Sequence, residues 1–99
     1  MKPGQEPIHI EFAKDAEREI QALPLANAQT VLREIQLRLS SEPAKGSKTR
    51  IKRLMGFTPP LFRLRIGDYR AYYRIAARQV VILTVLHKKD SERWLKRRR

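Results

Sequence analysis

A Gly67-Asp68 pair joins two segments of alternating polarity, Phe62 to Ile66 and Tyr69 to Ile75. A Gly-Asp pair between two such segments is typical of a two-residue hairpin with a primed turn. The turn then fixes the register of the two strands, so that Ile66 faces Tyr69 and Arg65 faces Arg70. This hairpin constrains the fold of the chain more than any other stretch.

The two faces of the predicted hairpin differ in chemistry, because side chains alternate along a strand. One face is predicted to be core and carries Phe62, Leu64, Ile66, Tyr69, Ala71, Tyr73 and Ile75. The other face carries Arg63, Arg65, Arg70, Tyr72 and Arg74. Like charges directly opposite one another destabilise a sheet, within the ~0.2–1 kcal/mol span of cross-strand pairs. A solvated basic surface is one reading of this face. We favour a phosphate site, because register gathers four arginines around one tyrosine.

Charge is distributed unevenly along the chain, which has a formal net charge of +12. Residues 1–44 hold five basic and seven acidic residues, a net of −2, whereas residues 45–99 hold 17 basic and three acidic residues, a net of +14. Such asymmetry makes a nucleic acid the first candidate partner and an acidic protein or peptide the second. Binding to either partner is expected to be sensitive to salt.

The length of 99 residues predicts a single domain, 1–99, with residues 1–7 as a loose arm and residues 96–99 as a basic tail. The absence of cysteine excludes disulfides and zinc-thiolate sites, and makes a reducing cytoplasm the default location. No apolar run approaches the ~18–20 residues of a membrane span, and the N-terminus lacks the apolar region of a signal peptide. We therefore expect a cytoplasmic protein with no membrane partner.

Two helices are predicted ahead of the hairpin. Ile8 to Phe12 alternates as a short strand, and the apolar period then lengthens to that of a helix, which Pro24 stops. A second helix is expected from about Leu25 to Leu39. Its predicted core stripe is Ala28, Val31, Leu32, Ile35 and Leu39.

The rest of the chain is predicted to complete an α+β fold. Ala44 to Gly56 is expected to be a basic connector, and the continuous apolar run Val80 to Leu86 is expected to be a central or doubly buried strand. A short helix follows from about Ser91. The prediction is a small antiparallel sheet in the order β-α-α-β-β-β, packed by the two N-terminal helices.

This arrangement resembles the RelE/ParE superfamily of type II toxins. The resemblance covers nearly all of the chain after residue 7 and rests on Phe-Ala-Lys-Asp-Ala at 12–16, Arg-Leu-Met-Gly at 53–56, the hairpin at 62–75, and Val-Leu-His-Lys-Lys-Asp at 85–90. It implies a cognate antitoxin in a hetero-oligomeric complex. It also implies one of two activities: RelE-like members cleave mRNA in the ribosomal A site, and ParE-like members poison DNA gyrase. Fold alone does not choose between them.

We expect the RelE-like activity, a ribosome-dependent mRNA endonuclease in which a ribose 2′-hydroxyl attacks the adjacent phosphate without a metal or other cofactor. A ParE-like gyrase inhibitor and a non-toxic nucleic-acid-binding module are the alternatives. The resemblance places catalytic positions at Arg63 and Arg65 before the turn, at Arg70 after it, at Lys89 or Lys88 beyond the last strand, and less securely at Trp94. Relatives commonly carry lysine at the first two positions. Arginine is a poor general base because its pKa exceeds ~12, so Arg63 and Arg65 are expected to bind phosphate and stabilise charge.

His87 is the predicted proton-transfer residue, because imidazole titrates near neutral pH. It is expected on the same face as Arg63, Arg65 and Arg70. The alternative is a strand-end histidine that only packs or caps. Trp94 is expected either to stack on a base or to close the core. Further RNA contacts are predicted from Lys52, Arg53, Tyr72, Arg74 and Lys88.

Overall fold

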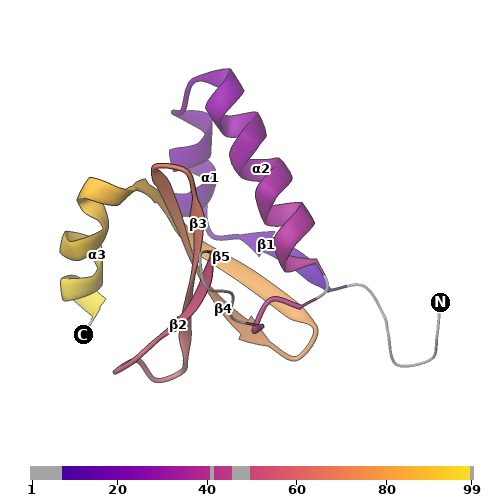
Figure 1. Cartoon of the computed structure of the whole chain (residues 1–99), viewed down its shortest axis with the longest axis vertical. Coiled ribbons are helices and arrows are strands. Elements are labelled where there is room, and N and C mark those ends of the chain that lie inside the picture. The colour runs from indigo at the N-terminus through magenta and orange to yellow at the C-terminus, as the bar shows by residue number, and fades with distance from the viewer. Residues whose placement is uncertain (1–7, 41, 46–49, 99) are drawn as a thin grey trace.

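A five-stranded sheet in the order β1-β5-β4-β3-β2 organises the chain in the computed structural model, which describes residues 8–40, 42–45 and 50–98 (Figure 1). The elements are β1 (His9–Phe12), α1 (Lys14–Gln21), α2 (Leu25–Leu39), β2 (Ile51–Leu54), β3 (Leu61–Ile66), β4 (Tyr69–Ala76), β5 (Gln79–His87), the 3-10 turn η1 (Lys88–Asp90) and α3 (Ser91–Arg98). The predicted α+β architecture is confirmed, with two helices before the hairpin and a short helix at the end.

The hairpin of β3 and β4 has the predicted register. Ile66 pairs with Tyr69, Arg65 with Arg70, and the pairing continues to Phe62 opposite Tyr73. Gly67 has a φ of +56°, which a primed turn requires at its first central residue and which glycine adopts without steric cost. The local sequence therefore sets the pairing on which the site depends.

The sheet has two features beyond the prediction. β2 is a strand paired antiparallel with β3, although its residues were expected to form a connector. The sequence Ile-Lys-Arg-Leu at 51–54 does not alternate in polarity, which hid this short edge strand from a period-two analysis. In addition, β1 runs parallel to β5, so the sheet is mixed and the expected wholly antiparallel pairing is wrong at this edge. β5 lies in the sheet interior, between β1 and β4. The expected central position of the apolar strand is confirmed.

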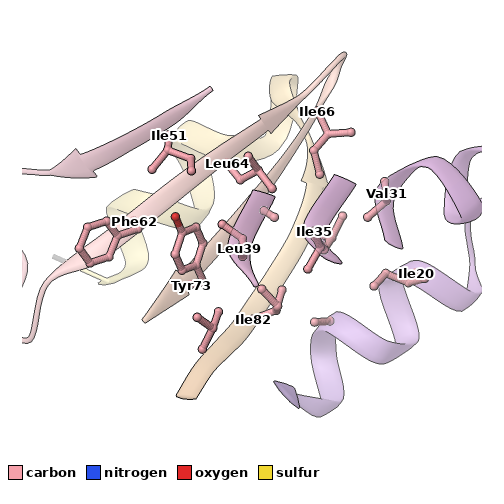
Figure 2. Packing of buried hydrophobic residues seen from close by; sticks show 14 residues of the cluster. Ile20, Val31, Ile35, Leu39, Ile51, Phe62, Leu64, Ile66, Tyr73 and Ile82 are labelled. Atoms are coloured by element: carbon pink, nitrogen blue, oxygen red, sulfur yellow. The ribbon is translucent and has the colours of Figure 1, made fainter. Parts of the chain in front are cut away.

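The hydrophobic core lies between the two N-terminal helices and one face of the sheet (Figure 2). α2 contributes Val31, Ile35 and Leu39 to it, at helical spacing. Leu32 was predicted to belong to this stripe, but its side chain is 42% exposed. It follows Val31 by one residue, a rotation of about 100° around the helix, and so turns away from the sheet.

The hairpin residues of the predicted core face lie where they were expected. Phe62, Leu64, Ile66, Ala71 and Tyr73 are buried in the core, and Tyr69 and Ile75 pack against it. The hydroxyl of Tyr73 donates a hydrogen bond of 2.6 Å to the carbonyl of Pro43. Burial raises the pKa of Tyr73 above its usual value, because it disfavours the phenolate.

The two chain ends bear on the predicted domain limits. The arm predicted at 1–7 lies outside the described residues. Lys96 to Arg98 of the predicted basic tail continue α3, and Arg99 lies outside the described residues. Within the described ranges, no helix is both long and apolar enough to cross a membrane.

Glu19 fastens α1 to β5 beyond the point where β1 stops pairing with that strand. β1 pairs with β5 only as far as Ile82, and a register irregularity follows between β4 and β5. Beyond it, the Glu19 carboxylate accepts hydrogen bonds from the Thr84 hydroxyl at 2.8 Å and from the Val85 N–H at 2.9 Å. The carboxylate thus satisfies an open stretch of strand edge.

Replacing this carboxylate should destabilise the fold. We expect Glu19→Ala to lower the free energy of unfolding by about 2 kcal/mol, because Thr84 and Val85 both lose a charged acceptor. Urea unfolding followed by circular dichroism measures the change. Glu17→Ala is the matched control, since Glu17 is an exposed carboxylate on the same helix; its cost should stay below about 1 kcal/mol. Equal losses in both variants would contradict the role given to Glu19.

Candidate anion-binding site

A row of basic side chains crosses the face of the sheet opposite the core. Arg65 lies directly across from Arg70, and Arg63 lies between Tyr72 on β4 and Lys52 on β2. By register this surface, here called the basic face, comprises Lys52, Arg63, Arg65, Arg70 and Arg74. The predicted gathering of arginines on one face is confirmed, and β2 adds a lysine to it.

Arg70 is the best anchored member of the basic face. Its Nη1 donates hydrogen bonds to the carbonyls of Gly67 at 2.8 Å and Tyr69 at 2.9 Å, which hold the guanidinium against the turn. Burial lowers the pKa of Arg70 from its usual value, and the positive charges of Arg63 and Arg65 lower it further. The charged form is therefore under repulsion that a bound anion would relieve.

The segment after β5 is fastened to the same turn. The Lys88 N–H donates to the carbonyl of Asp68 at 2.7 Å, and the Lys88 ammonium lies 3.4 Å from the Asp68 carboxylate. The ion pair is exposed and contributes little to stability. The ion pair holds the Lys88 side chain near the turn, whereas the Lys89 side chain is exposed on η1.

His87 lies on the other side of the sheet from the arginines. It pairs with Tyr69, a residue of the core side, and the two rings meet edge to face at 5.8 Å. Its Nδ1 accepts a hydrogen bond of 3.2 Å from the Lys89 N–H, so a neutral ring carries its proton on Nε2. The prediction that His87 shares a face with Arg65 and Arg70 is therefore wrong, because the β4–β5 register places His87 on the core side.

Helix α3 covers the middle of the basic face. The Trp94 ring stacks on Tyr72 with centroids 5.0 Å apart and an interplanar angle of 24°. Tyr72 is only 2% exposed, so its predicted RNA contact is blocked by α3. Trp94 is partly buried, and the guanidinium of Arg98 lies 4.5 Å from its ring centroid. Of the two roles expected for Trp94, packing is realised, and its remaining exposed part can still meet a ligand.

The other predicted RNA-binding residues divide between the two faces. Lys52 and Arg74 belong to the basic face by register. Arg53 pairs with Phe62, whose side chain is in the core, so Arg53 lies on the opposite side of the sheet from the arginines. Across the described ranges, no three His, Asp or Glu side chains cluster as a metal ion would need.

Comparison with known proteins identifies the family. A sequence model described as the ParE toxin of the type II toxin-antitoxin system parDE matches residues 10–92. The chain belongs to this toxin family. The match spans β1 to the start of α3 and thus includes the whole basic face. The comparison with curated proteins gave no match.

Solved structures place the same family in the wider RelE/ParE superfamily. The toxin-antitoxin complex RelBE2 of Mycobacterium tuberculosis contains a chain 32% identical to this one, with a TM-score of 0.70, covering 82% of this chain and 91% of that one. The RelE-RelB complex of Pyrococcus horikoshii gives 26% identity and a TM-score of 0.67, covering 81% and 93%. The fold is also similar to that of a copper-bound toxin mutant from Helicobacter pylori, at 18% identity, a TM-score of 0.63, and coverage of 84% and 97%. The predicted superfamily is confirmed, and this ParE-family protein is a toxin of a type II toxin-antitoxin system.

The arginine pair makes a testable contribution to stability. In dilute buffer without phosphate, Arg65→Gln should raise the free energy of unfolding by ~0.2–1 kcal/mol, because it removes a like-charge cross-strand pair. Added phosphate should then stabilise the variant less than it stabilises the parent toxin. Denaturant unfolding with and without phosphate measures both effects. Arg33→Gln removes the same charge from an exposed position on α2; an identical response there would show that net charge alone is responsible.

Proposed function

We propose that this toxin is a ribosome-dependent mRNA endonuclease. The observation that carries the proposal is the Arg65–Arg70 pair, which the register holds on one face, with the Arg70 guanidinium anchored to the turn. Two guanidinium groups in this position fit a phosphodiester, because each presents several donors in a plane. The repulsion within this pair favours a bound anion, which either a phosphodiester or an acidic partner surface could supply.

The chemistry assigned to the arginines is charge stabilisation. In this reaction the ribose 2′-hydroxyl loses its proton and bonds to the neighbouring phosphorus, the P–O5′ bond breaks, and the 5′-oxygen leaves with a proton. Negative charge grows on the non-bridging oxygens as the 2′-oxygen attacks. Arg70 is fixed in place by the Gly67 and Tyr69 carbonyls through Nη1, so its other nitrogens can meet that charge with little reorganisation. Arg65 supplies a second cation, and Arg63 and Lys52 continue the track for the RNA backbone.

Proton transfer falls to the segment at the end of β5. No residue of the basic face is a good proton acceptor, since the face consists of arginines and a lysine. His87 and Lys89 are the proposed groups, with Lys88 bound to Asp68 holding the segment near the turn. Protonation of His87 at Nδ1 requires breaking its bond with the Lys89 N–H. Because the neutral ring carries its proton on Nε2, His87 can act as a proton acceptor only at Nδ1, after this hydrogen bond has opened.

Gyrase inhibition is the second candidate function. The match to a ParE family model favours it, as does the placement of His87 across the sheet from the arginines. Under this alternative the basic face binds an acidic protein surface, and no bond in RNA is broken.

Induction of the toxin in cells, followed by mapping of mRNA 5′ ends, separates these functions. The parent toxin should generate cuts inside translated codons. Arg70→Ala should reduce cutting by about 10²–10³-fold, because it removes a preorganised charge-stabilising donor. Arg33→Ala is the control, an exposed arginine on α2 outside the basic face, and should cut at the parent rate.

Each outcome of this experiment is decisive. Intact messages together with DNA damage and an SOS response would overturn the endonuclease and support the gyrase inhibitor. Intact messages and intact DNA, with growth unaffected, would support a non-toxic binding module. Circular dichroism of Arg70→Ala must show the parent fold, since misfolding would also abolish cutting.

The role of His87 has its own prediction. We expect His87→Ala to slow cleavage less than Arg70→Ala does, because the imidazole is engaged with Lys89 and lies across the sheet from the arginine pair. Single-turnover cleavage on programmed ribosomes is the assay. A His87→Ala variant that cuts at the parent rate would contradict the proton-transfer role proposed for His87.

A cognate antitoxin is the remaining proposed partner. Two of the similar structures are complexes with RelB-type proteins. An acidic antitoxin would neutralise part of the basic half of this chain. Exposed Leu25, Leu32 and Leu37 on α2 offer apolar contacts for a helix or extended segment laid across the N-terminal helices.

A further inference from the structure

A second cluster of cations lies at the far end of the basic face. A cleft of about 510 Å³ opens between the start of α1 and the second half of α3. Its lining residues are Asp15, Arg74, Trp94, Arg97 and Arg98. Three of the five are arginines, and one is the only tryptophan of the chain.

Helix α3 separates this cleft from the Arg65–Arg70 pair. Tyr72 lies between Arg70 and Arg74 along β4, and Trp94 of α3 is stacked on it. The four-residue step from Arg70 to Arg74 spans about 13 Å at ~3.3 Å per strand residue. A stacked nucleic-acid strand advances ~3.4 Å per nucleotide, so about four nucleotides bridge the two positions.

The chemistry of the cleft suits a nucleotide. Guanidinium groups provide donors for phosphate, and the indole provides a surface for a base. The guanidinium of Arg98 lies 4.5 Å from the centroid of the Trp94 ring, so the indole already accepts a planar cation. A base can stack on that guanidinium or replace it.

Two further observations support the assignment of the cleft to a nucleotide. The Nε of Arg74 is buried and has no hydrogen-bond partner among the described residues, so this guanidinium is partly removed from water and benefits from an anion at its outer nitrogens. The Asp15 carboxylate pairs with Arg18 at 2.9 Å at the rim. A carboxylate there can accept hydrogen bonds from ribose hydroxyls or base amino groups, donors that the carboxylate side chains of an acidic peptide lack.

We propose that the cleft between α1 and α3 is a subsite for single-stranded RNA, which holds one phosphate and one base about four nucleotides from the phosphate bound by Arg65 and Arg70. The proposal rests on the proposed function for the identity of the nucleic acid. It adds Arg74, Arg97 and Arg98 as positioning residues that grip the strand without touching the reacting atoms.

Tryptophan fluorescence reports on this subsite, because Trp94 is the single tryptophan of the chain and lines the cleft. The experiment titrates the parent toxin with oligouridylates of two and eight nucleotides in the absence of ribosomes, on which the proposed cleavage depends, so the strands stay intact. The eight-mer should quench Trp94 and bind at least about tenfold more tightly than the dimer, because only the longer strand reaches both positions. Inorganic phosphate should bind more weakly than either.

Substitutions in the cleft test its residues individually. In the same titration, Arg97→Gln and Arg98→Gln should each raise the Kd for the eight-mer about threefold or more and reduce the slope of log K against log salt by about 0.7. Arg93→Gln is the matched control, because Arg93 is exposed on the same helix and does not line the cleft. Its effect on both quantities should be clearly smaller. Circular dichroism verifies that each variant keeps the parent fold.

The outcomes separate this inference from the proposed function. If cells show codon-level mRNA cuts but the eight-mer neither quenches Trp94 nor responds to Arg97→Gln, the subsite is wrong and the endonuclease stands. If Arg93→Gln weakens binding as much as Arg97→Gln does, the helix acts only through its net charge, and the subsite is overturned. Stronger quenching by oligoglutamate than by RNA would also overturn it, in favour of an acidic peptide. Cleft-dependent RNA binding without cuts in cells would support the subsite and overturn the endonuclease.

Discussion

The pairing of Arg65 with Arg70 across the β3–β4 hairpin is the constraint on which the basic face depends. The Gly67-Asp68 turn sets the register, and the register places Arg65 directly opposite Arg70 on the same face of the sheet. A shift of one residue would place both arginines in the core and expose the apolar face. The same apolar burial that stabilises the hairpin therefore enforces the electrostatic cost at the site. The packed core and the cationic face are two consequences of one alternation.

Helix α3 determines how much of the basic face is accessible to a ligand. By stacking Trp94 on Tyr72, it builds a small apolar contact on the side of the sheet opposite the main core, and it covers the centre of the face. Cations remain accessible at the two ends: Arg65 and Arg70 near the turn, and Arg74 beside the cleft. The helix thus converts a continuous basic surface into two separated sites, with a spacing set by the strand between them.

The sequence predicted local features well, but it did not predict which residues lie on which face of the sheet after β4 or which of them a later helix covers. The hairpin register, both N-terminal helices and the central apolar strand follow from alternation, helical spacing and turn residues, all of which are local. β2 was missed because four residues without alternation become a strand only when β3 is present to pair with them. Tyr72 was assigned to RNA because nothing local reveals that Trp94, more than twenty residues later, returns to cover it. His87 was grouped with the arginines because the register irregularity in β4–β5 and the pairing with Tyr69 are tertiary facts.

Arginine at the two positions before the turn shapes the chemistry that this toxin can perform. Arg63 and Arg65 offer donors and positive charge but no lone pair for a proton. Any acid or base must therefore come from outside the basic face. The fold supplies one such connection, because Asp68 of the turn binds both the N–H and the ammonium of Lys88 and so ties the segment after β5 to the site of Arg70. Under the proposed endonuclease activity, the hairpin would stabilise charge, and the end of β5 or the ribosome itself would move protons.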